Sequence, residues 1–363
     1  MGIQDFESKA LSFHNDYSNS FLGDAVFSFL PVFSIRLRIS FYRMQIIIIV
    51  WDPPKTIQFE KIIISRGLRE FMELVSVILC VYKEPIKYIS DAIQSIINQT
   101  YKNIQLIIVI DYPDSDELYD FLENVQRTDS RIKLVKNEKN LGLVESLNSG
   151  LNHCDGSFIA RMDADDISVL CRLEKQLKYL KENELDLVGS WYDTFIDDVE
   201  SVEGECVHYR TEDIHNTLRI ASCLPHPTWL GKREVFIYNK GYRDIKACED
   251  YDFLIRAYQS GFKLGNVPEI LLHYRLNPNS ISHINNIHQK VVFKYLSKNF
   301  KKGSIVSIDD YYRFINDSVD YINLRKAYKC IINTKNKKSI SNYLKLFRII
   351  VDRNCLKTYL KYK

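Results

Sequence analysis

The sequence predicts an α/β protein with a mostly parallel central sheet that is covered by helices on both faces. Continuous apolar stretches of strand length recur along the chain, and amphipathic stretches with helical spacing lie between them. This alternation is typical of parallel sheets that are buried on both faces. Polar residues follow strand after strand, and open α/β sheets bind their ligands at the carboxyl ends of their strands. We therefore expect a ligand site along that edge.

The regular pattern begins near residue 74. Strands are expected at 74–81, 104–110, 132–135, 157–161 and 185–189, and helices at 86–97, 117–125, 143–151 and 170–180. Residues 191–283 are less regular, which suits an α+β half that binds a second substrate. From 284 onward the pattern is mostly helical, for instance at 341–353.

Composition divides the 363 residues into three parts. We expect an N-terminal extension without a clear pattern at 1–71, the main α/β domain at 72–283, and a basic, mostly helical C-terminal region at 284–363. The apolar stretch 21–51 is interrupted by charges such as Asp24, so we do not expect it to span a membrane. The eight cysteines form no Cys-x-x-Cys pair, which fits a cytoplasmic location.

Charge is distributed unevenly along the chain. Residues 284–363 hold 18 Lys and Arg against 5 Asp, a net charge of +13, whereas the remainder carries −10. Such a basic region suits contact with an anionic membrane surface, here the inner face of the cell membrane. A Lys-rich helical face that is simply solvated, or that packs on another part of the protein, explains the charge equally well.

Three carboxylates follow the strand expected at 157–161. They are Asp163, Asp165 and Asp166, in the run Arg161-Met162-Asp163-Ala164-Asp165-Asp166. Carboxylate oxygens suit Mg²⁺ or Mn²⁺, which usually keep positions open for substrate phosphates. The alternative is an acidic turn that caps the next helix.

Other polar groups follow the neighbouring strands. Tyr82 and Glu84 come after the first strand, Asp111 after the second, and Asn140 with Gly142 after the third. The first strand is followed neither by Gly-x-Gly-x-x-Gly nor by a Walker loop, which argues against a dinucleotide or P-loop site. A nucleotide here would be held by a pocket for base and ribose, together with a metal on its diphosphate.

A second acidic pair lies far downstream. Glu249 and Asp250 stand just before a short amphipathic helix, where they could serve only as its cap. A catalytic role requires a partner site, and the carboxylates at 163–166 supply one.

In this order the segments resemble family 2 glycosyltransferases of the GT-A fold, the type that builds bacterial surface polysaccharides. The matching segments within about 73–283 are 75–84, 106–111, 140–150, 160–166, Arg172-Leu173, Glu249-Asp250 and Tyr274-Arg275 with Ser280. Two departures stand out. After the second strand the family often has Asp-Asp-Gly-Ser, whereas this chain has Ile110-Asp111-Tyr112-Pro113, so one acidic group is lost and Asp111 remains at the second position. The second departure is Asn277, which replaces a frequent His.

The resemblance implies a hexosyltransferase-type enzyme that inverts the anomeric centre and depends on Mn²⁺ or Mg²⁺. The donor would be a nucleotide sugar, most often a UDP-sugar, and the acceptor a hydroxyl of a glycan or a lipid-linked sugar. The implied donor-binding residues are Tyr82, Glu84, Asp111, Asn140 and Asp163; the metal residues are Asp163 and Asp165; the catalytic residues are Asp250, as general base, and Glu249.

Two other functions are weighed against this one. A nucleotidyltransferase needs a Gly-rich basic loop after the first strand, and Tyr82-Lys83-Glu84-Pro85 has no glycine. A non-catalytic carbohydrate-binding relative would have lost the metal or base motif, and both are present. The Gln-x-x-Arg-Trp signature of processive synthases is absent, which favours one sugar per event. His226 lines the acceptor pocket or is structural, and the sequence does not separate the two.

Overall fold

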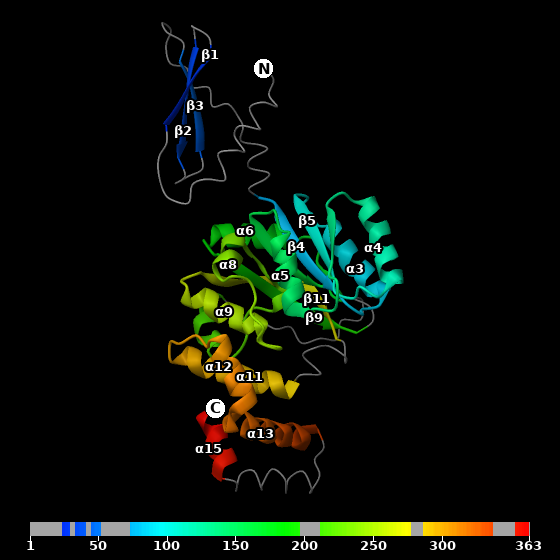
Figure 1. Cartoon of the computed structure of the whole chain (residues 1–363), viewed down its shortest axis with the longest axis vertical. Coiled ribbons are helices and arrows are strands. Elements are labelled where there is room, and N and C mark those ends of the chain that lie inside the picture. The colour runs from blue at the N-terminus through cyan, green and yellow to red at the C-terminus, as the bar shows by residue number, and fades with distance from the viewer. Residues whose placement is uncertain are drawn as a thin grey trace. The chain divides into compact units, whose positions relative to one another are not determined.

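The computed structural model describes residues 24–29, 33–40, 45–51, 73–196, 211–276, 286–336 and 353–362 (Figure 1). The chain forms two compact units, Met1–Arg69 and Glu70–Lys363. In the first unit the described strands are β1 (Asp24–Phe29), β2 (Phe33–Ser40) and β3 (Gln45–Trp51). They form an antiparallel sheet in the order β1-β2-β3.

The second unit is built on an eight-stranded sheet with the order β6-β5-β4-β7-β10-β9-β11-β8. Its first half consists of β4 (Val75–Val81), β5 (Ile104–Ile110), β6 (Ile132–Lys136) and β7 (Phe158–Asp163). These four strands are parallel, as the sequence predicted. Their carboxyl ends therefore share one edge of the sheet.

The other half of the sheet is mixed. Short β10 (Leu230–Lys232) runs antiparallel to both β7 and β9 (Leu187–Phe195), and joins the two halves. Beyond it β11 (Leu264–Arg275) runs parallel to β9, and β8 (Ile167–Ser168) pairs antiparallel with the end of β11. Because β8 follows directly on β7 and its acidic turn, this pairing brings the end of β11 to the same turn.

Helices cover both faces of the sheet, and the core is accordingly double. One cluster holds Val77 and Leu79 of β4 together with α3 (Ile86–Ile97), α4 (Asp116–Thr128) and α6 (Arg172–Glu182). The other holds Ile78 of β4 together with α5 (Leu143–Asn152) and α9 (Glu249–Gln259). Successive residues of a strand point to opposite faces, so a continuous apolar strand serves both clusters.

The segment between β9 and β11 also contains shorter helices. They are η2 (Thr211–Asp213), α7 (Ile214–Leu218), η3 (His226–Thr228) and α8 (Arg233–Tyr238). The loop before α9 is tied to α5 by Asn148, whose side-chain amide donates to the carbonyl of Tyr242 at 2.9 Å and accepts from its N–H at 2.8 Å. Asn148 thereby fixes this loop against the parallel half of the sheet.

The C-terminal region is helical where it is described. It contains α11 (Asn286–Lys301), α12 (Ile308–Asp317), α13 (Val319–Asn336) and α15 (Arg353–Lys361). α11 packs on α9: the rings of Phe293 and Tyr251 lie 4.3 Å apart, and Val292 and Leu296 join the core cluster of α9. The helix expected at 341–353 lies largely outside the described residues. In the described ranges no helix combines the length and apolar character needed to cross a membrane.

Candidate active site

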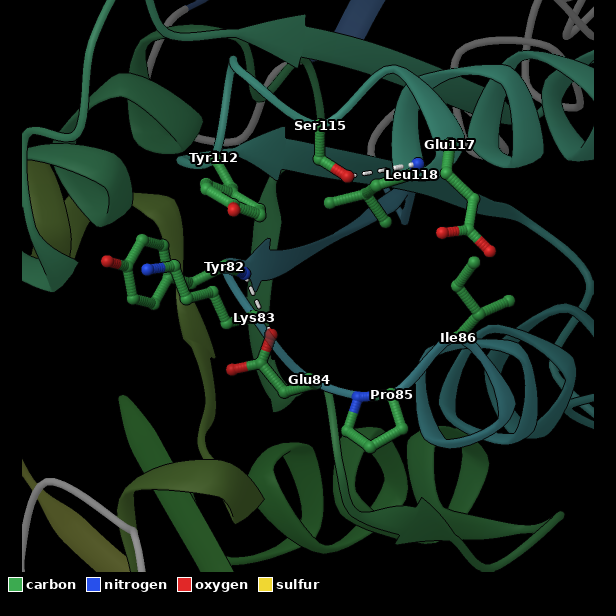
Figure 2. Close-up of a pocket in the computed structure, with 9 residues that line it drawn as sticks. All are labelled: Tyr82, Lys83, Glu84, Pro85, Ile86, Tyr112, Ser115, Glu117 and Leu118. Carbon is green, nitrogen blue, oxygen red and sulfur yellow. Dashed lines mark hydrogen bonds between the residues drawn. The ribbon is translucent and has the colours of Figure 1, made fainter.

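The carboxyl ends of β4 and β5 border a pocket of about 390 Å³. Its lining is Tyr82, Lys83, Glu84, Pro85, Ile86, Tyr112, Ser115, Glu117 and Leu118 (Figure 2). The rings of Tyr82 and Tyr112 meet edge to face with 5.5 Å between centroids. The ammonium group of Lys83 lies 5.0 Å from one ring centre and 4.9 Å from the other. Two aromatic faces and a cation are suited to a flat, polar ring such as a nucleobase.

Glu84 shapes the first loop of this pocket. Its carboxylate accepts the backbone N–H of Tyr82 at 2.7 Å, which folds the loop after β4 back on itself. Burial, opposed by that hydrogen bond and joined by the negative charge of Asp163, raises the pKa of Glu84. Glu84 therefore lines the pocket and is also influenced by the charge of the acidic turn after β7.

Asp111 is buried and its carboxylate binds another loop of the protein. One oxygen accepts from the side-chain amide of Asn137 at 2.8 Å and from the N–H of Leu141 at 2.7 Å. The other accepts the N–H of Gly142 at 2.9 Å, a group that the side chain of Asn140 also contacts at 3.0 Å. Asp111 thus fixes the loop between β6 and α5. The sequence suggested a different role for this residue, a hydrogen bond with the base or ribose of a nucleotide.

Gly142 gives this loop its geometry. Its φ of +82° lies in the left-handed region that favours glycine, and it is the residue before the first turn of α5. Nothing lies within 4 Å of a Cβ placed there, so the backbone angle and not space requires glycine.

Asp163, Asp165 and Asp166 form a compact cluster at the end of β7. One carboxylate oxygen from each lies within 4.8 Å of those of the other two. Asp166 is fully buried; one of its oxygens accepts the backbone N–H of Arg275 at 2.9 Å, and the other has no hydrogen-bond partner in the described part of the chain. Hard oxygen donors at this spacing, one of them unsatisfied, fit a divalent cation such as Mg²⁺ or Mn²⁺.

Burial and mutual repulsion raise the pKa values of the carboxylates in this cluster. Burial, followed by the charges of Asp163 and Glu84, raises the pKa of Asp165 to about 7. Burial, followed by Asp163 and Asp165, raises the pKa of Asp166 well above its ordinary value. A bound cation would favour the ionised form of each carboxylate.

Arg161 is a buried cation that sequence reasoning did not single out. It pairs with Asp163, two residues further along β7 and on the same face of the strand. Burial favours the neutral guanidine, yet the surrounding groups, Asp163 first, hold the pKa of Arg161 above its ordinary value. The charge of Arg161 also lowers the pKa of Glu249 and of Asp250, against the effect of their burial, so it acts on that pair as well as on the acidic cluster.

Arg275 clamps the acidic turn from β11. Its Nε donates to the carbonyl of Asp165 at 2.8 Å, while its backbone N–H holds Asp166. The guanidinium lies 3.8 Å from the ring centre of Tyr88 and 4.3 Å from that of Phe195. The sequence placed Arg275 in a closing segment without a role, and the remainder of that segment, with Asn277 and Ser280, lies outside the described residues.

Glu249 and Asp250 are the first two residues of α9. The N–H of Tyr251 donates to Asp250 at 2.7 Å. Burial, followed by the charge of Asp250, raises the pKa of Glu249 to about 8, and burial also raises the pKa of Asp250. The charge of Asp163 also raises the pKa of Glu249, so the pair lies within the electrostatic range of the acidic cluster. Neighbouring carboxylates with raised pKa values can accept protons near neutral pH.

His226 occupies a buried position. Its Nε2 lies 2.9 Å from the hydroxyl of Tyr242, and its ring lies 4.5 Å from that of Trp229. Burial, followed by the positive charge of Arg161, lowers the pKa of His226 well below its ordinary value. Between the two alternatives for this residue, the contacts favour a neutral structural histidine.

The comparisons with known proteins agree on one family. The model described as glycosyl transferase family 2 matches residues 76–238. An uncharacterized glycosyltransferase of Methanocaldococcus jannaschii is 36% identical over 225 residues, which cover 61% of this chain and 77% of the relative. The O-antigen biosynthesis glycosyltransferase WbnJ of Escherichia coli is 33% identical over 212 residues, which cover 58% of this chain and 82% of WbnJ.

A solved structure shows the same fold. TarS of S. aureus, crystallised as a fragment in complex with UDP-GlcNAc, matches with a TM-score of 0.54 and 16% identity, over 79% of this chain and 81% of that chain. In a longer crystal structure of TarS the match covers 49% of that chain, with a TM-score of 0.52. At this identity the likeness concerns the fold.

Together the fold and these matches define a glycosyltransferase of the GT-A class. The chain belongs to glycosyltransferase family 2, as its ordered motifs suggested. The expected fold, a mostly parallel sheet flanked by helices with a helical C-terminal part, is confirmed.

Proposed function

We propose that the protein transfers one sugar per event from a nucleotide-sugar donor, a UDP-sugar by family resemblance, to a hydroxyl of a glycan or lipid-linked acceptor. The observation that carries this proposal is the proximity of two acidic groups with different environments. Asp163, Asp165 and Asp166 form a cation-sized cluster, and buried Glu249 with partly exposed Asp250 forms a second acidic pair within its electrostatic range. A reaction of this kind needs both a leaving-group stabiliser and a base, and the two acidic groups are proposed to supply them.

The donor would lie along the carboxyl edge of β4, β5 and β7. The base would stack on Tyr82 beside Tyr112 and Lys83 in the pocket of Figure 2. Glu84 and Asp163 would accept hydrogen bonds from the ribose. Asp111 and Asn140 would act by holding the loop at Gly142, because their described hydrogen bonds run to that loop.

The metal would be Mn²⁺ or Mg²⁺ with Asp165 as a ligand and Asp163 beside it. When bound, such an ion supplies positive charge to the departing diphosphate. Asp250 would take the proton of the acceptor hydroxyl as that oxygen attacks the anomeric carbon, with Glu249 as its neighbour. Direct attack by one nucleophile inverts the anomeric centre and needs one base and no covalent intermediate.

The acceptor is proposed to be a growing surface polysaccharide. This rests on relatives named for O-antigen biosynthesis in Escherichia coli and for amylovoran biosynthesis in Erwinia amylovora, the latter 28% identical. Such glycans contain many hydroxyls. We propose that residues 191–283, the half expected to bind the second substrate, select the hydroxyl that reacts.

We also propose that the basic C-terminal region contacts an anionic membrane surface. Lys298, Lys301 and Lys302 lie at the end of α11, and Lys361 ends α15. Burial, followed by the charges of Lys361 and Lys302, lowers the pKa of Lys298. Positive charges that crowd one another in this way are suited to a polyanionic partner. The apolar face expected at 343–351 lies outside the described residues.

Product analysis tests the proposed reaction. The purified protein is incubated with a panel of sugar nucleotides, Mn²⁺ and a lipid-linked or oligosaccharide acceptor, and the anomeric configuration of the product is read by NMR. The proposal expects the configuration to be opposite to that of the donor. Retention of configuration would contradict the assignment of Asp250 as the single base.

A further inference from the structure

We propose that Tyr311 and Tyr312, in the basic C-terminal region, are positioning residues for the proposed catalytic pair, Glu249 and Asp250. Their hydroxyl groups hold the loop 244–248, which leads directly into this pair at the start of α9. The inference rests on the proposed function of Asp250 as the base. It goes beyond that function because it gives a task in the reaction to α12, a helix outside the part of the chain that the family model matches.

The helix α12 binds this loop at two places. The hydroxyl of Tyr312 donates to the carboxylate of Asp244 at 2.7 Å. The hydroxyl of Tyr311 accepts the backbone N–H of Lys246 at 3.2 Å. Ile245, between these two contacts, is fully buried and belongs to the same core cluster as Tyr311. The loop is thus held by hydrogen bonds on either side of a buried apolar residue.

The catalytic pair is flanked by residues that contact α11, which lies beside α9 (Figure 1). The thiol of Cys248, directly before the pair, donates to the carbonyl of Gln289 at 3.5 Å. The ring of Tyr251, directly after the pair, lies 4.3 Å from that of Phe293. Gln289 and Phe293 are four residues apart and therefore lie on one face of α11. The C-terminal region thus contacts the chain immediately before and after the two carboxylates.

The end of the loop has a backbone conformation that needs support from its surroundings. Ala247 has a φ of +60°, in the left-handed region where a residue with a side chain costs free energy. The same turn is closed by the N–H of Cys248, which donates to the carbonyl of Ile245 at 2.9 Å. A strained residue of this kind persists only when the structure around it fixes it. The contacts of α12 with Asp244 and Lys246 supply part of that support.

The α/β domain holds the start of the same loop. Asp252 of α9 is fully buried and pairs with both Arg243 and Arg256. Arg256 also donates to the carbonyl of Gly241 at 3.0 Å. These contacts fix the chain up to Arg243, and those of α12 begin at the next residue. Loss of the tyrosine hydroxyls should therefore loosen the loop while the domain stays folded.

Two measurements on the full chain test this inference. Hydrogen–deuterium exchange follows the backbone amides of 244–252, and single-turnover transfer uses the donor and acceptor found by the product analysis above. The variants are Tyr311→Phe, Tyr312→Phe and Asp244→Ala; Tyr312 is 39% exposed. Each should speed exchange in this segment and lower the transfer rate by about 10-fold, because small displacements of a reacting group are costly. The Kd of the donor nucleotide should stay within about 2-fold of the wild type, as a change confined to the transfer step requires.

A double-mutant cycle separates the hydrogen bond from general effects. A protein with both Tyr312→Phe and Asp244→Ala should be no slower than either single variant, because the two changes remove the same contact. Asp244→Asn keeps an oxygen that can accept from Tyr312, so its transfer rate should be near that of the wild type. The control is Tyr362→Phe, which removes a hydroxyl that donates to Asp320 at 3.2 Å elsewhere in the C-terminal region. This control should change neither exchange in the loop nor transfer.

The outcomes distinguish the inference from the function on which it rests. Wild-type exchange and transfer in Tyr312→Phe and Asp244→Ala would overturn the inference, provided that Asp250→Asn is slow. An equal loss in Asp244→Asn and Asp244→Ala would also overturn it, by assigning the effect to charge. If Asp250→Asn transferred sugar at the wild-type rate, the proposed base itself would be wrong. If Tyr311→Phe does not fold, Tyr312→Phe and Asp244→Ala still decide, because both positions are exposed.

Discussion

Asp111 and Gly142 are joined by a hydrogen bond of 2.9 Å across 31 residues of sequence, from the N–H of Gly142 to the carboxylate. The end of β5 thereby holds the start of α5 and the loop that precedes it. The family's usual second-strand motif is altered on both sides of Asp111, yet this contact is made by the Asp111 side chain that remains.

Asp111→Asn is expected to destabilise the protein and to weaken nucleotide binding. The new amide group meets N–H donors instead of accepting from them, and each buried donor left unsatisfied costs about 1–3 kcal/mol. Thermal unfolding and calorimetry with UDP measure the two effects. Asp114→Asn, an exposed position three residues later, is the matched control. If the two variants behaved alike, the contact to Gly142 would not stabilise the loop.

Much of this fold could be predicted because its strands are buried on both faces. β4 and β5 are continuous apolar runs, and their expected bounds differ from those observed by one residue at most. β9 was expected to end at 189 but continues to Phe195. Its later residues mix polar and aromatic side chains without a regular alternation, and their pairing with β11 is a contact between distant segments that local pattern does not reveal.

The acidic residues of the candidate site could be predicted from the sequence, whereas its basic side chains were harder to predict. Carboxylates that follow strands stand out in a sequence, whereas Arg161 lies inside a strand and reads as an interruption of it. Side chains two residues apart in a strand point to the same face of the sheet, so the sequence could have predicted that Arg161 lies beside Asp163. The clamp by Arg275 was not, because it depends on β8 pairing with β11. The roles of Glu249 and Asp250 stay predictions.

Asp250→Asn is expected to lower the transfer rate by at least ~10²-fold while donor affinity changes little, as loss of a general base would produce. Single-turnover transfer and calorimetry with the donor nucleotide are measured on the same preparation. Glu249→Gln serves as the comparison. A variant that loses affinity and rate together would identify Asp250 as a support of the fold or donor, and full activity in Asp250→Asn would transfer the role to Glu249.

Glu249→Gln is expected to stabilise the protein increasingly as pH rises. Burial, followed by Asp250, raises the pKa of Glu249 from 4.5 to about 8, so the folded state holds this proton more tightly than the unfolded chain. The stability that Glu249 contributes is complete below about pH 4.5 and is lost progressively as pH rises through about 8. Glutamine cannot ionise, so the variant does not lose this stability at high pH.

Urea unfolding at several pH values measures the difference in unfolding free energy between Glu249→Gln and the wild type. The difference should grow from about pH 5 to about pH 8 and then level off. Glu234→Gln, an exposed glutamate in the first turn of α8, should show no such trend. A flat difference for Glu249→Gln would mean that this carboxyl titrates normally.

Replacing three basic residues of the C-terminal region is expected to weaken membrane binding. Each Lys near an anionic surface contributes about 1 kcal/mol, so losing three that all face the membrane should reduce vesicle binding by roughly 100-fold at low salt. The variant carries Gln at Lys298, Lys301 and Lys302; the control carries Gln at Lys87, Lys102 and Lys139. Substitution is preferred to truncation because α11 contributes Val292 and Leu296 to the core.

Co-sedimentation with phosphatidylserine vesicles and with neutral vesicles gives the readout. Equal binding of the variant and its control would assign the charge to a solvated helical face. Binding that does not depend on anionic lipid would lead to the same conclusion.

The central claim is that Asp165 supports metal-dependent cleavage of a nucleotide sugar at the edge of this sheet. Its most direct test is release of nucleoside diphosphate from a panel of sugar nucleotides by the purified protein, with Mn²⁺, with EDTA, and with Asp165→Ala in place of the wild type. The account predicts release with Mn²⁺, none with EDTA, and none from the variant under either condition. Release that persists in EDTA, or undiminished Mn²⁺-stimulated release by Asp165→Ala, would contradict it.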